Sequence, residues 1–383
     1  MELKEYRFDE VTINFDKKRV PLSGAQREKR QGNFRYYGAQ GVIDHIDDFI
    51  FDGTYLLIAE DGENLKSKKQ NIAQVVEGQF WVNNHAHIVQ GNELCNTRYL
   101  CYLLNSMDLS GYVTGSAQPK LSQANLNAVT LFLPSITVQE RIVECLYLFD
   151  KKIAVNQKIN DNLQQQAAAI FRSWFVDYVP FGGTVPDEWK NVTLEDITTL
   201  VSRGITPKYA DDTGQIVINQ KCIRNHMIDL SFARSHRPKV INNKWLQFGD
   251  LLINSTGDGT LGRAAQVWFQ PKNLTVDSHV TIARPAKENL IFYIGLWGIL
   301  HEKEIESLHI GSTGQTELPR DRVKAMELLL PDNDTLDRFN ALITPMATAI
   351  VANQEENNRL AALRDAILPK LMSGKIDVSA IQP

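Results

Sequence analysis

Two short stretches have the residue types that cofactor binding or catalysis needs. Gly257-Asp258-Gly259-Thr260-Leu261-Gly262 fits the GxGxxG spacing of dinucleotide-binding turns. No helix-forming run follows it and Pro271 comes soon after, so it is better interpreted as a turn that lets the backbone approach a phosphate or a base edge. Pro186-Asp187-Glu188-Trp189-Lys190 imitates fragments of a nuclease metal site. Because its acids are contiguous, they cannot converge from two strands on one metal, and we expect a linker with Trp189 packed.

The remaining signatures of an enzyme are missing. His85, His87 and His279 lack companions at metal-ligand spacing and are expected to be core or loop histidines, with no metal site. The chain has no GxxxxGK[ST] phosphate loop. It also has no Pro-Pro dipeptide, so it lacks the Asn/Asp-Pro-Pro-aromatic loop with which amino-methyltransferases hold the target amine. We therefore expect a non-catalytic chain, and a standalone DNA methyltransferase or nuclease is the disfavoured enzymatic alternative.

Basic residues gather in two stretches although the net charge of the 383 residues is −4. Residues 17–37 hold seven basic residues and the single acid Glu28, and residues 203–244 hold eight against Asp211, Asp212 and Asp229. Arginine and lysine clamp phosphates and read guanine, and glutamine reads adenine. The family resemblance given at the end of this section implies DNA binding, and on that basis the expected DNA contacts are Lys17, Lys18, Arg19, Arg27, Lys29, Arg30, Arg35, Tyr36, Tyr37, Gln118, Arg203, Lys208, Lys221, Arg224, Arg234, Arg237, Lys239, Ser255, Thr256, Thr260, Arg263 and Gln315.

Each of these assignments has a plainer alternative. A basic side chain can belong to a merely solvated face, and Tyr36 and Tyr37 can be packing residues. The turn Glu60-Asp61-Gly62 corresponds to the Gly-rich turn at 257–262, but its acids repel phosphate. A contact with a cytosine amino group or a structural role is therefore expected there.

A long helix is predicted to follow Pro134. Thr137 and Glu140 form a capping-box pair. Apolar residues then recur at heptad spacing up to Trp174, which is typical of a coiled coil. Pro180 and Gly182-Gly183 are expected to end the helix. The seam of apolar positions is interrupted by Asn156 and Asn160, which cost stability but set the register.

The pattern returns after a shift of 197 residues. Leu133-Pro134 becomes Leu330-Pro331, Thr137…Glu140 becomes Asp334…Asp337, and the two asparagines become Asn353 and Asn357. The same shift relates Gln118 to Gln315. The chain is therefore interpreted as a duplicated unit, a globular part followed by a long helix, given twice. Pro345 lies inside the second helix, where we expect a kink or a break before it, and Pro369 should kink the end.

The globular parts are predicted to be mixed α/β. Short strands are expected at 56–58, 80–82, 86–89 and 129–133, and a helix at 98–107. In the second copy, residues 248–253 correspond to the strand at 56–58, and residues 277–282 correspond to residues 83–88. The apolar run 290–300 is too short to span a bilayer and should form a buried helix. The start has no apolar signal segment, and the four cysteines show no CxxC spacing, which favours a reducing cytoplasm.

Several stretches together resemble the specificity subunit of type I restriction-modification enzymes. They are the residues 36–43, Phe51-Asp52-Gly53, Val82 to His87, Val185 to Lys190, and Arg364-Asp365-Ala366-Ile367-Leu368-Pro369-Lys370-Leu371. The resemblance covers the whole chain. It implies an α+β fold in which two similar α/β target recognition domains are joined and spaced by two long antiparallel coiled-coil helices, as a pseudo-twofold internal repeat.

The resemblance also implies a division of labour. Residues 1–133 and 181–330 would each read one half of a bipartite DNA target, and residues 134–180 and 331–383 would be helical spacers. Two methyltransferase subunits would dock on the helices, and ATP-dependent restriction subunits would join them. S-adenosylmethionine is then expected on the partners, with no cofactor on this chain. Helices of about 40 residues are about 60 Å long, which allows a gap of at most roughly 18 base pairs. The alternative outside enzymes is a protein–protein scaffold, or an orphan specificity protein without an active restriction partner.

Overall fold

The computed structural model describes residues 2–67, 70–115, 118–210, 213–237, 240–257, 259–311, 316–376 and 378. The fold is α+β, with sheets, short helices and two helices of 40 residues each. The chain divides into two compact units. Unit 1 is Met1–Ala154 with Asn357–Pro383, and unit 2 is Val155–Glu356. Each unit contains a globular part and a segment of both long helices, α5 (Ile136–Phe175) and α9 (Asn333–Met372).

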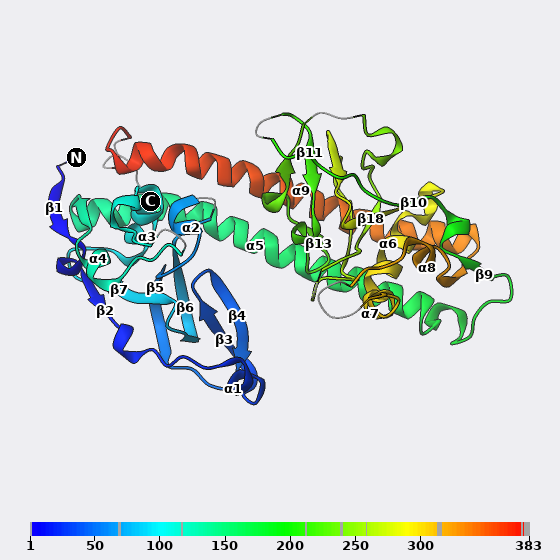
Figure 1. The fold of residues 1–383 in the computed structure, drawn as a ribbon, viewed down its shortest axis with the longest axis horizontal. Helices are drawn as coiled ribbons and strands as arrows, with labels where there is room; N and C mark the ends of the chain where they lie inside the picture. The colour runs from blue at the N-terminus through cyan, green and yellow to red at the C-terminus, as the bar shows by residue number, and fades with distance from the viewer. Residues whose placement is uncertain are drawn as a thin grey trace. The chain divides into compact units, whose positions relative to one another are not determined.

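The globular part of unit 1 is built on a mixed sheet with the strand order β2-β7-β5-β6-β3-β4. Figure 1 shows β3 and β4 at one side of it, with α1 at their end. The predicted strands and helix are confirmed: three strands are longer than predicted, the strand at 129–133 begins one residue later, and the helix is shifted by one residue. The elements are β1 (Lys4–Arg7), β2 (Thr12–Asn14), α1 (Gly24–Glu28), β3 (Gln31–Gly38), β4 (Gly41–Ile46), β5 (Phe51–Ala59), α2 (Asn64–Ser67), β6 (Ala73–Val82), β7 (Ala86–Gly91), α3 (Thr97–Ser106), α4 (Gln123–Asn127) and β8 (Thr130–Leu133).

Unit 2 is organised around the sheet β10-β18-β15-β16 and the helix α6. The run 290–300 forms this helix, and Phe292 to Gly298 are all buried. A helix that is apolar all round must lie inside the core, as predicted. The elements are β9 (Lys190–Thr193), β10 (Thr198–Arg203), β11 (Ile216–Ile218), β12 (Ile223–Arg224), β13 (Met227–Ile228), β14 (Arg234–Ser235), β15 (Leu251–Asn254), β16 (Ala264–Gln266), β17 (Leu274–Val276), β18 (Val280–Pro285), α6 (Ile291–Leu300), α7 (Glu302–Ser307), α8 (Arg320–Lys324) and β19 (Glu327–Leu330).

The same hydrogen bonds recur inside the two units. The first and last strands of each globular part pair antiparallel, β1 with β8 and β9 with β19. After the first strand, the Phe8 N–H donates to the Val129 carbonyl at 2.9 Å in unit 1. The Leu194 N–H donates to the Met326 carbonyl, also at 2.9 Å, in unit 2. Each bond joins the beginning of a globular part to the residue just before its last strand. The segment that leads into α5 is therefore held by the same kind of bond as the segment that leads into α9.

Both long helices contribute asparagines to their shared seam. In unit 2, Asn156 and Asn160 are almost completely buried. The Asn156 amide donates to the Glu356 carboxylate at 2.7 Å, and the Asn353 amide donates to the Asn160 side-chain oxygen at 2.8 Å. As residue numbers rise along α5 they fall along α9, so the two segments run antiparallel. Asn357, like Asn353, is half-buried.

The helix starts and the prolines correct three predictions. α5 begins at Ile136, so Thr137 lies in the first turn and is not the cap. α9 begins at Asn333, and its cap is Asp332, which accepts from the Thr335 N–H at 2.9 Å. Of the kink or break expected before Pro345, the break is wrong, because α9 continues through Pro345 and Pro369 to Met372, and the kinks at these two prolines stay predictions. Pro345 lies on the exposed side of the helix, where water can satisfy the carbonyl that loses its partner.

A buried ion pair joins β7 to the loop after β2 in unit 1. His87 Nδ1 lies 2.6 Å from Asp16 Oδ2, and Nε2 lies 2.9 Å from the Leu121 carbonyl oxygen. Both ring nitrogens face acceptors, so both are satisfied only in the imidazolium form. Burial alone would lower the pKa of His87, but its bonds with Asp16 and Leu121 raise it above 6.5. Burial likewise opposes ionisation of Asp16, but the His87 and Ile88 hydrogen bonds hold the pKa of Asp16 below its usual range.

The pair makes the stability of the chain depend on pH. The contribution of His87 is complete below its unfolded pKa of about 6.5 and is lost as pH rises through its raised folded pKa. The contribution of Asp16 is lost on the acid side, as pH falls through its lowered pKa. We expect His87→Gln to lower the free energy of unfolding by roughly 3–5 kcal/mol near pH 6 and to remove the decline above pH 6.5. Denaturant unfolding followed by circular dichroism between pH 5 and 9 measures both effects.

The matched control is His85→Gln, which changes an exposed histidine two residues away. It should keep the alkaline decline of the native chain. A His87→Gln chain that retained the native pH profile would contradict the assignment of the charge to His87.

Candidate nucleic-acid interface

Three of the predicted arginines in unit 1 lie over aromatic rings of the sheet. Their planar guanidinium groups stack on these rings, which holds the long side chains in place. The pairs are Arg27 over Tyr36 at 5.2 Å from the ring centre, Arg30 over Trp81 at 5.0 Å, and Arg35 over Tyr37 at 5.6 Å. The aromatic residues come from β3 and β6, so the central strands of the sheet position these cations.

Acids of β4 and of the following loop neutralise part of this charge. Arg27 Nε donates to Asp44 Oδ2 at 2.8 Å, and Arg30 Nε donates to Asp47 Oδ1 at 2.9 Å. The bond from Arg27 lowers the pKa of Asp44. Asp44 and Asp47 lie outside residues 17–37, so a count of charges within that stretch does not include them. The β3–β4 hairpin brings them next to the arginines. Lys17, Lys18 and Lys29 remain exposed.

Three of the predicted contacts in unit 1 are partly or fully buried instead. Tyr36 is completely buried, and its hydroxyl oxygen accepts from the Leu22 N–H at 2.9 Å. Arg19 donates to Glu60 Oε2 at 3.0 Å and to the Ala86 carbonyl oxygen at 2.9 Å. These positions hold the strands together and offer no free edge to a base. Tyr37 is also buried, and burial raises the pKa of its hydroxyl.

In unit 2, Arg234 is an exposed stacked cation. Its guanidinium lies 3.6 Å from the centre of the Tyr209 ring, and the Tyr209 residue is 40% exposed. The Arg237 N–H donates to the Lys208 carbonyl at 2.8 Å, which brings a second predicted pair beside the first. Arg224 stacks on Phe232 at 4.4 Å, and Lys221 is exposed nearby in sequence. The loops around β11 and β14 therefore gather several of the predicted cations.

The Gly-rich turn joins β15 to β16 as an antiparallel hairpin. Among the described residues of this turn, 255–257 and 259–263, no helix begins, and the dinucleotide hypothesis gains no support from them. Gly262 has φ +82° and a Cβ atom would meet the Glu302 carbonyl at 2.9 Å, so a glycine is required. Ser255 is completely buried and its hydroxyl bonds Thr281 at 2.6 Å, which removes it from direct DNA contact. Arg263 is exposed, with Nη2 donating to the Gly259 carbonyl at 2.7 Å.

The remaining predicted residues are divided between the surface and internal bonds. Thr256 is half-buried and bonds His279 Nδ1 at 2.7 Å, and Thr260 donates back to the Thr256 carbonyl at 3.3 Å. Arg203 forms an ion pair with Glu317 at 2.6 Å. Gln118 is exposed. Lys239 and Gln315 lie outside the described residues.

The stretch that imitates a nuclease site has a structural role. Trp189 is buried against Phe175 and Phe181, and its Nε1 donates to Asp332 Oδ2 at 3.3 Å. Packing of Trp189 is therefore confirmed. Lys190 begins β9, where it pairs with Leu330 of β19. Within the described ranges, no group of three or more His, Cys, Asp or Glu could hold a metal ion.

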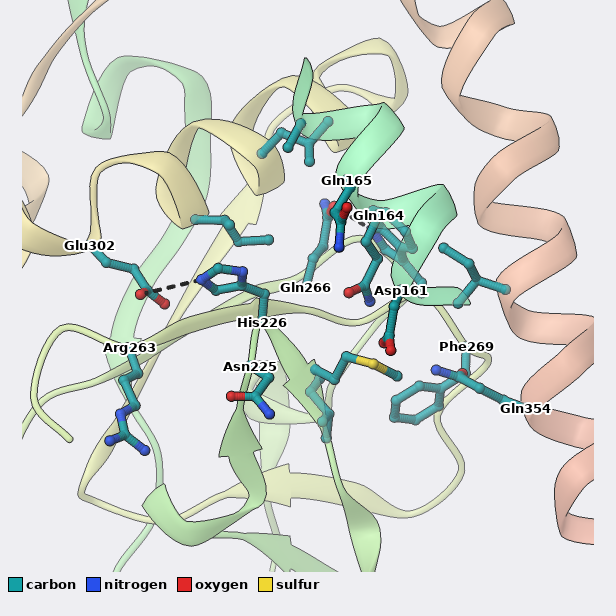
Figure 2. A pocket seen from close by; sticks show the side chains of 17 residues that line it. Asp161, Gln164, Gln165, Asn225, His226, Arg263, Gln266, Phe269, Glu302 and Gln354 are labelled. Carbon is teal, nitrogen blue, oxygen red and sulfur yellow. Dashed lines mark hydrogen bonds and ion pairs between the residues drawn. The ribbon is translucent and has the colours of Figure 1, made fainter. Parts of the chain in front are cut away.

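A cavity of about 720 Å³ lies within unit 2. Figure 2 shows Asp161, Gln164 and Gln165 reaching it from α5, with the His226 ring turned toward Glu302. The His226 Nε2 and Glu302 Oε2 atoms are 3.4 Å apart. Of the predicted DNA contacts, Arg263 lines this cavity. Its walls mix carboxylates, amides and apolar side chains, so it lacks the continuous positive charge of a phosphate channel.

Lys120 and Glu317 are surface residues that the sequence analysis did not select. Each forms a two-residue antiparallel bridge with a neighbouring loop, Lys120 with Thr114 and Glu317 with Ile310. The shift of 197 residues aligns Lys120 with Glu317. The same shift relates Gln118 to Gln315 in the sequence.

Comparisons with known proteins agree with this arrangement. Residues 2–165 match the type I restriction modification DNA specificity domain. A type I restriction enzyme specificity subunit of Haemophilus influenzae is 24% identical, covering 94% of each chain. The MjaIX specificity subunit of Methanocaldococcus jannaschii is 25% identical, covering 74% of this chain and 70% of its own.

The solved structures include the S subunit of a type I restriction-modification system from M. genitalium. It aligns with a TM-score of 0.56 over 97% of this chain and 96% of that chain, at 12% identity, which indicates a shared fold. In the part of the chain that the structure describes, no helix is long and apolar enough to cross a membrane. By the domain match and the two relatives, the chain is similar to type I restriction-modification DNA specificity subunits.

Proposed function

We propose that each globular part reads one half of a bipartite DNA target. Residues 1–133 form the first recognition domain and residues 181–330 the second. The observation that carries this proposal is the set of stacked arginines, presented by unlike loops on a similar strand frame. Arg234 on Tyr209 is held with its guanidinium edge at an exposed position. A guanidinium edge pairs with guanine O6 and N7 in the major groove.

The chain itself is non-catalytic in this proposal. Both stretches that imitate enzyme motifs have structural roles, one as the β15–β16 hairpin turn and the other as the packing of Trp189. Adenine methylation would be carried out by two methyltransferase subunits with their own S-adenosylmethionine. Restriction subunits with ATP-dependent translocase and nuclease activity would join them, in the cytoplasm.

The long helices would set the gap between the half-sites and provide docking surfaces for the methyltransferase subunits. The two recognition domains would then be related by a pseudo-twofold axis. Antiparallel asparagine bonds at Asn160 and Asn353 support this role, because they tolerate only one register of α5 against α9.

The primary test is a map of adenine methylation. DNA from cells that contain the chain and its methyltransferase partner should show a split motif, two short blocks around a fixed unspecified gap. The same cells without the chain should lack the motif. Methylation that is identical with and without the chain would instead favour a protein–protein scaffold or an orphan specificity protein.

Replacing Arg234 and Arg237 by alanine should weaken recognition of one half-site. Loss of one good bidentate contact is worth about 1–3 kcal/mol, so methylation of sites with the native half-site should fall by about tenfold or more. The other half-site should keep its sequence. Arg320→Ala is a matched control, because Arg320 is exposed on α8, where it pairs only with its neighbour Asp321 among the described residues. Equal loss at both half-sites would contradict the two-reader model.

Deleting seven residues within 142–170, upstream of Asn156, should change the gap and spare both half-sites. One heptad is about 10.5 Å of helix, which corresponds to about three base pairs. The methylation map measures the new gap directly. A four-residue deletion at the same place is the control, because it rotates the apolar seam and should destabilise the helix pair. Altered half-sites with an unchanged gap would show that the helices do not act as a ruler.

A further inference from the structure

The same main-chain bonds recur in both units around a turn, a histidine and a bridging residue. In unit 1, the Glu60 N–H donates to the His85 carbonyl at 3.0 Å and the Leu121 N–H to the Glu60 carbonyl at 2.8 Å. In unit 2, the Ser255 N–H donates to the His279 carbonyl at 2.8 Å and the Leu318 N–H to the Ser255 carbonyl at 2.9 Å. A turn, a histidine and a bridging strand residue are therefore placed alike.

The histidine of each cluster is oriented in the same way. In unit 1, the His85 N–H donates to Asn83 Oδ1 at 2.8 Å, and ring Nδ1 lies 2.7 Å from Asp61 Oδ2. In unit 2, the His279 N–H donates to Asp277 Oδ1 at 2.9 Å. Its ring Nδ1 lies 2.7 Å from Thr256 Oγ1. Because Nδ1 is bonded toward the turn, the rest of each exposed ring faces outward.

The bridging residue differs between the two clusters in sign of charge. Lys120 and Glu317 each exchange two main-chain hydrogen bonds with their bridge partner, at 2.8 to 2.9 Å. The Lys120 side chain is 54% exposed and the Glu317 side chain is 53% exposed. The same backbone position thus presents a cation to solvent in one unit and an anion in the other.

This sign reversal decides between three roles for the cluster. A phosphate contact shared by both units would be attracted to Lys120 and repelled by Glu317. A docking site for two copies of one partner protein would meet opposite charges at its two positions, which is unfavourable at one of them. A base-reading position has the opposite requirement, because two half-sites of different sequence need different side chains.

We propose that Lys120 and Glu317 are equivalent specificity-determining residues, each reading one base of its own half-site. This inference rests on the proposed function. Lysine donates to guanine O6 and N7, and glutamate accepts from the cytosine N4 amino group. Each side chain is held by an ion pair inside its own unit until DNA is present. Lys120 Nζ lies 3.3 Å from Glu60 Oε1. Glu317 Oε1 lies 2.6 Å from Arg203.

The test exchanges the charges one unit at a time. Lys120→Glu and Glu317→Lys are each expressed with the methyltransferase partner, and adenine methylation is mapped. Each variant should reduce methylation of the native target about tenfold or more and relax or change one position in one half-site. The half-site altered by Lys120→Glu should differ from the one altered by Glu317→Lys. Lys120→Gln and Glu317→Gln remove the charge without reversing it, and they should relax the same two positions.

The controls make the same charge changes on exposed strand residues of the same units. Lys4→Glu on β1 and Glu327→Lys on β19 should leave the motif unchanged. Circular dichroism of each purified chain identifies a variant that fails to fold, and the glutamine variant then decides for that unit.

The outcomes separate the two proposals. Absence of any motif that depends on the native chain would overturn the proposed function. If every Lys120 and Glu317 variant retains the native motif at full methylation, this inference alone is overturned. The two residues would then serve only as members of structural ion pairs. A uniform loss that preserves every position of both half-sites would also overturn it, and would indicate phosphate or partner-protein contacts.

Discussion

The bond between Asn353 and Asn160 is the constraint on which the arrangement of the long helices depends. A buried amide loses its hydrogen bonds to water, so it must find a partner inside the seam. Sliding α9 along α5 by one turn would separate these amides and leave both unsatisfied. Leucine at the same positions would bury more apolar surface, yet it would accept several registers. The asparagines therefore lower the stability of the helix pair but restrict α5 and α9 to a single register.

A second constraint acts on the globular parts. Their main-chain bonds are nearly identical around the turn, the histidine and the bridging residue, although the side chains differ. Backbone bonds of this kind do not depend on side-chain identity, so residues on such a frame can change without loss of the fold. The loops between the shared strands vary in length and composition for the same reason. In unit 1 they form a β3–β4 hairpin with stacked arginines, and in unit 2 they form the short strands around Tyr209 and Arg234.

Much of the fold could be predicted because the signals were local and periodic. The heptad seam placed Asn156 and Asn160 inside, and the apolar run at 290–300 had to be a buried helix. The failures came from tertiary context. Tyr36 and Ser255 have the residue types of DNA contacts, but neighbouring elements cover them. The break at Pro345 was expected from the lost hydrogen bond alone, whereas its exposed position lets water replace that bond. Arg27 and Arg30 looked free because Asp44 and Asp47 are distant in sequence.

Those last ion pairs change what salt should do to DNA binding. A lysine or arginine that neutralises a phosphate releases a condensed counterion, and each release steepens the fall of affinity with salt. Arg27 and Arg30 already have carboxylate partners, so a phosphate must displace Asp44 or Asp47 before either arginine can bind it. The exchange replaces one ion pair with another and frees two carboxylates that attract cations from solution. If residues 1–133 read DNA as proposed, they should bind it with a shallower salt dependence than their number of basic residues suggests.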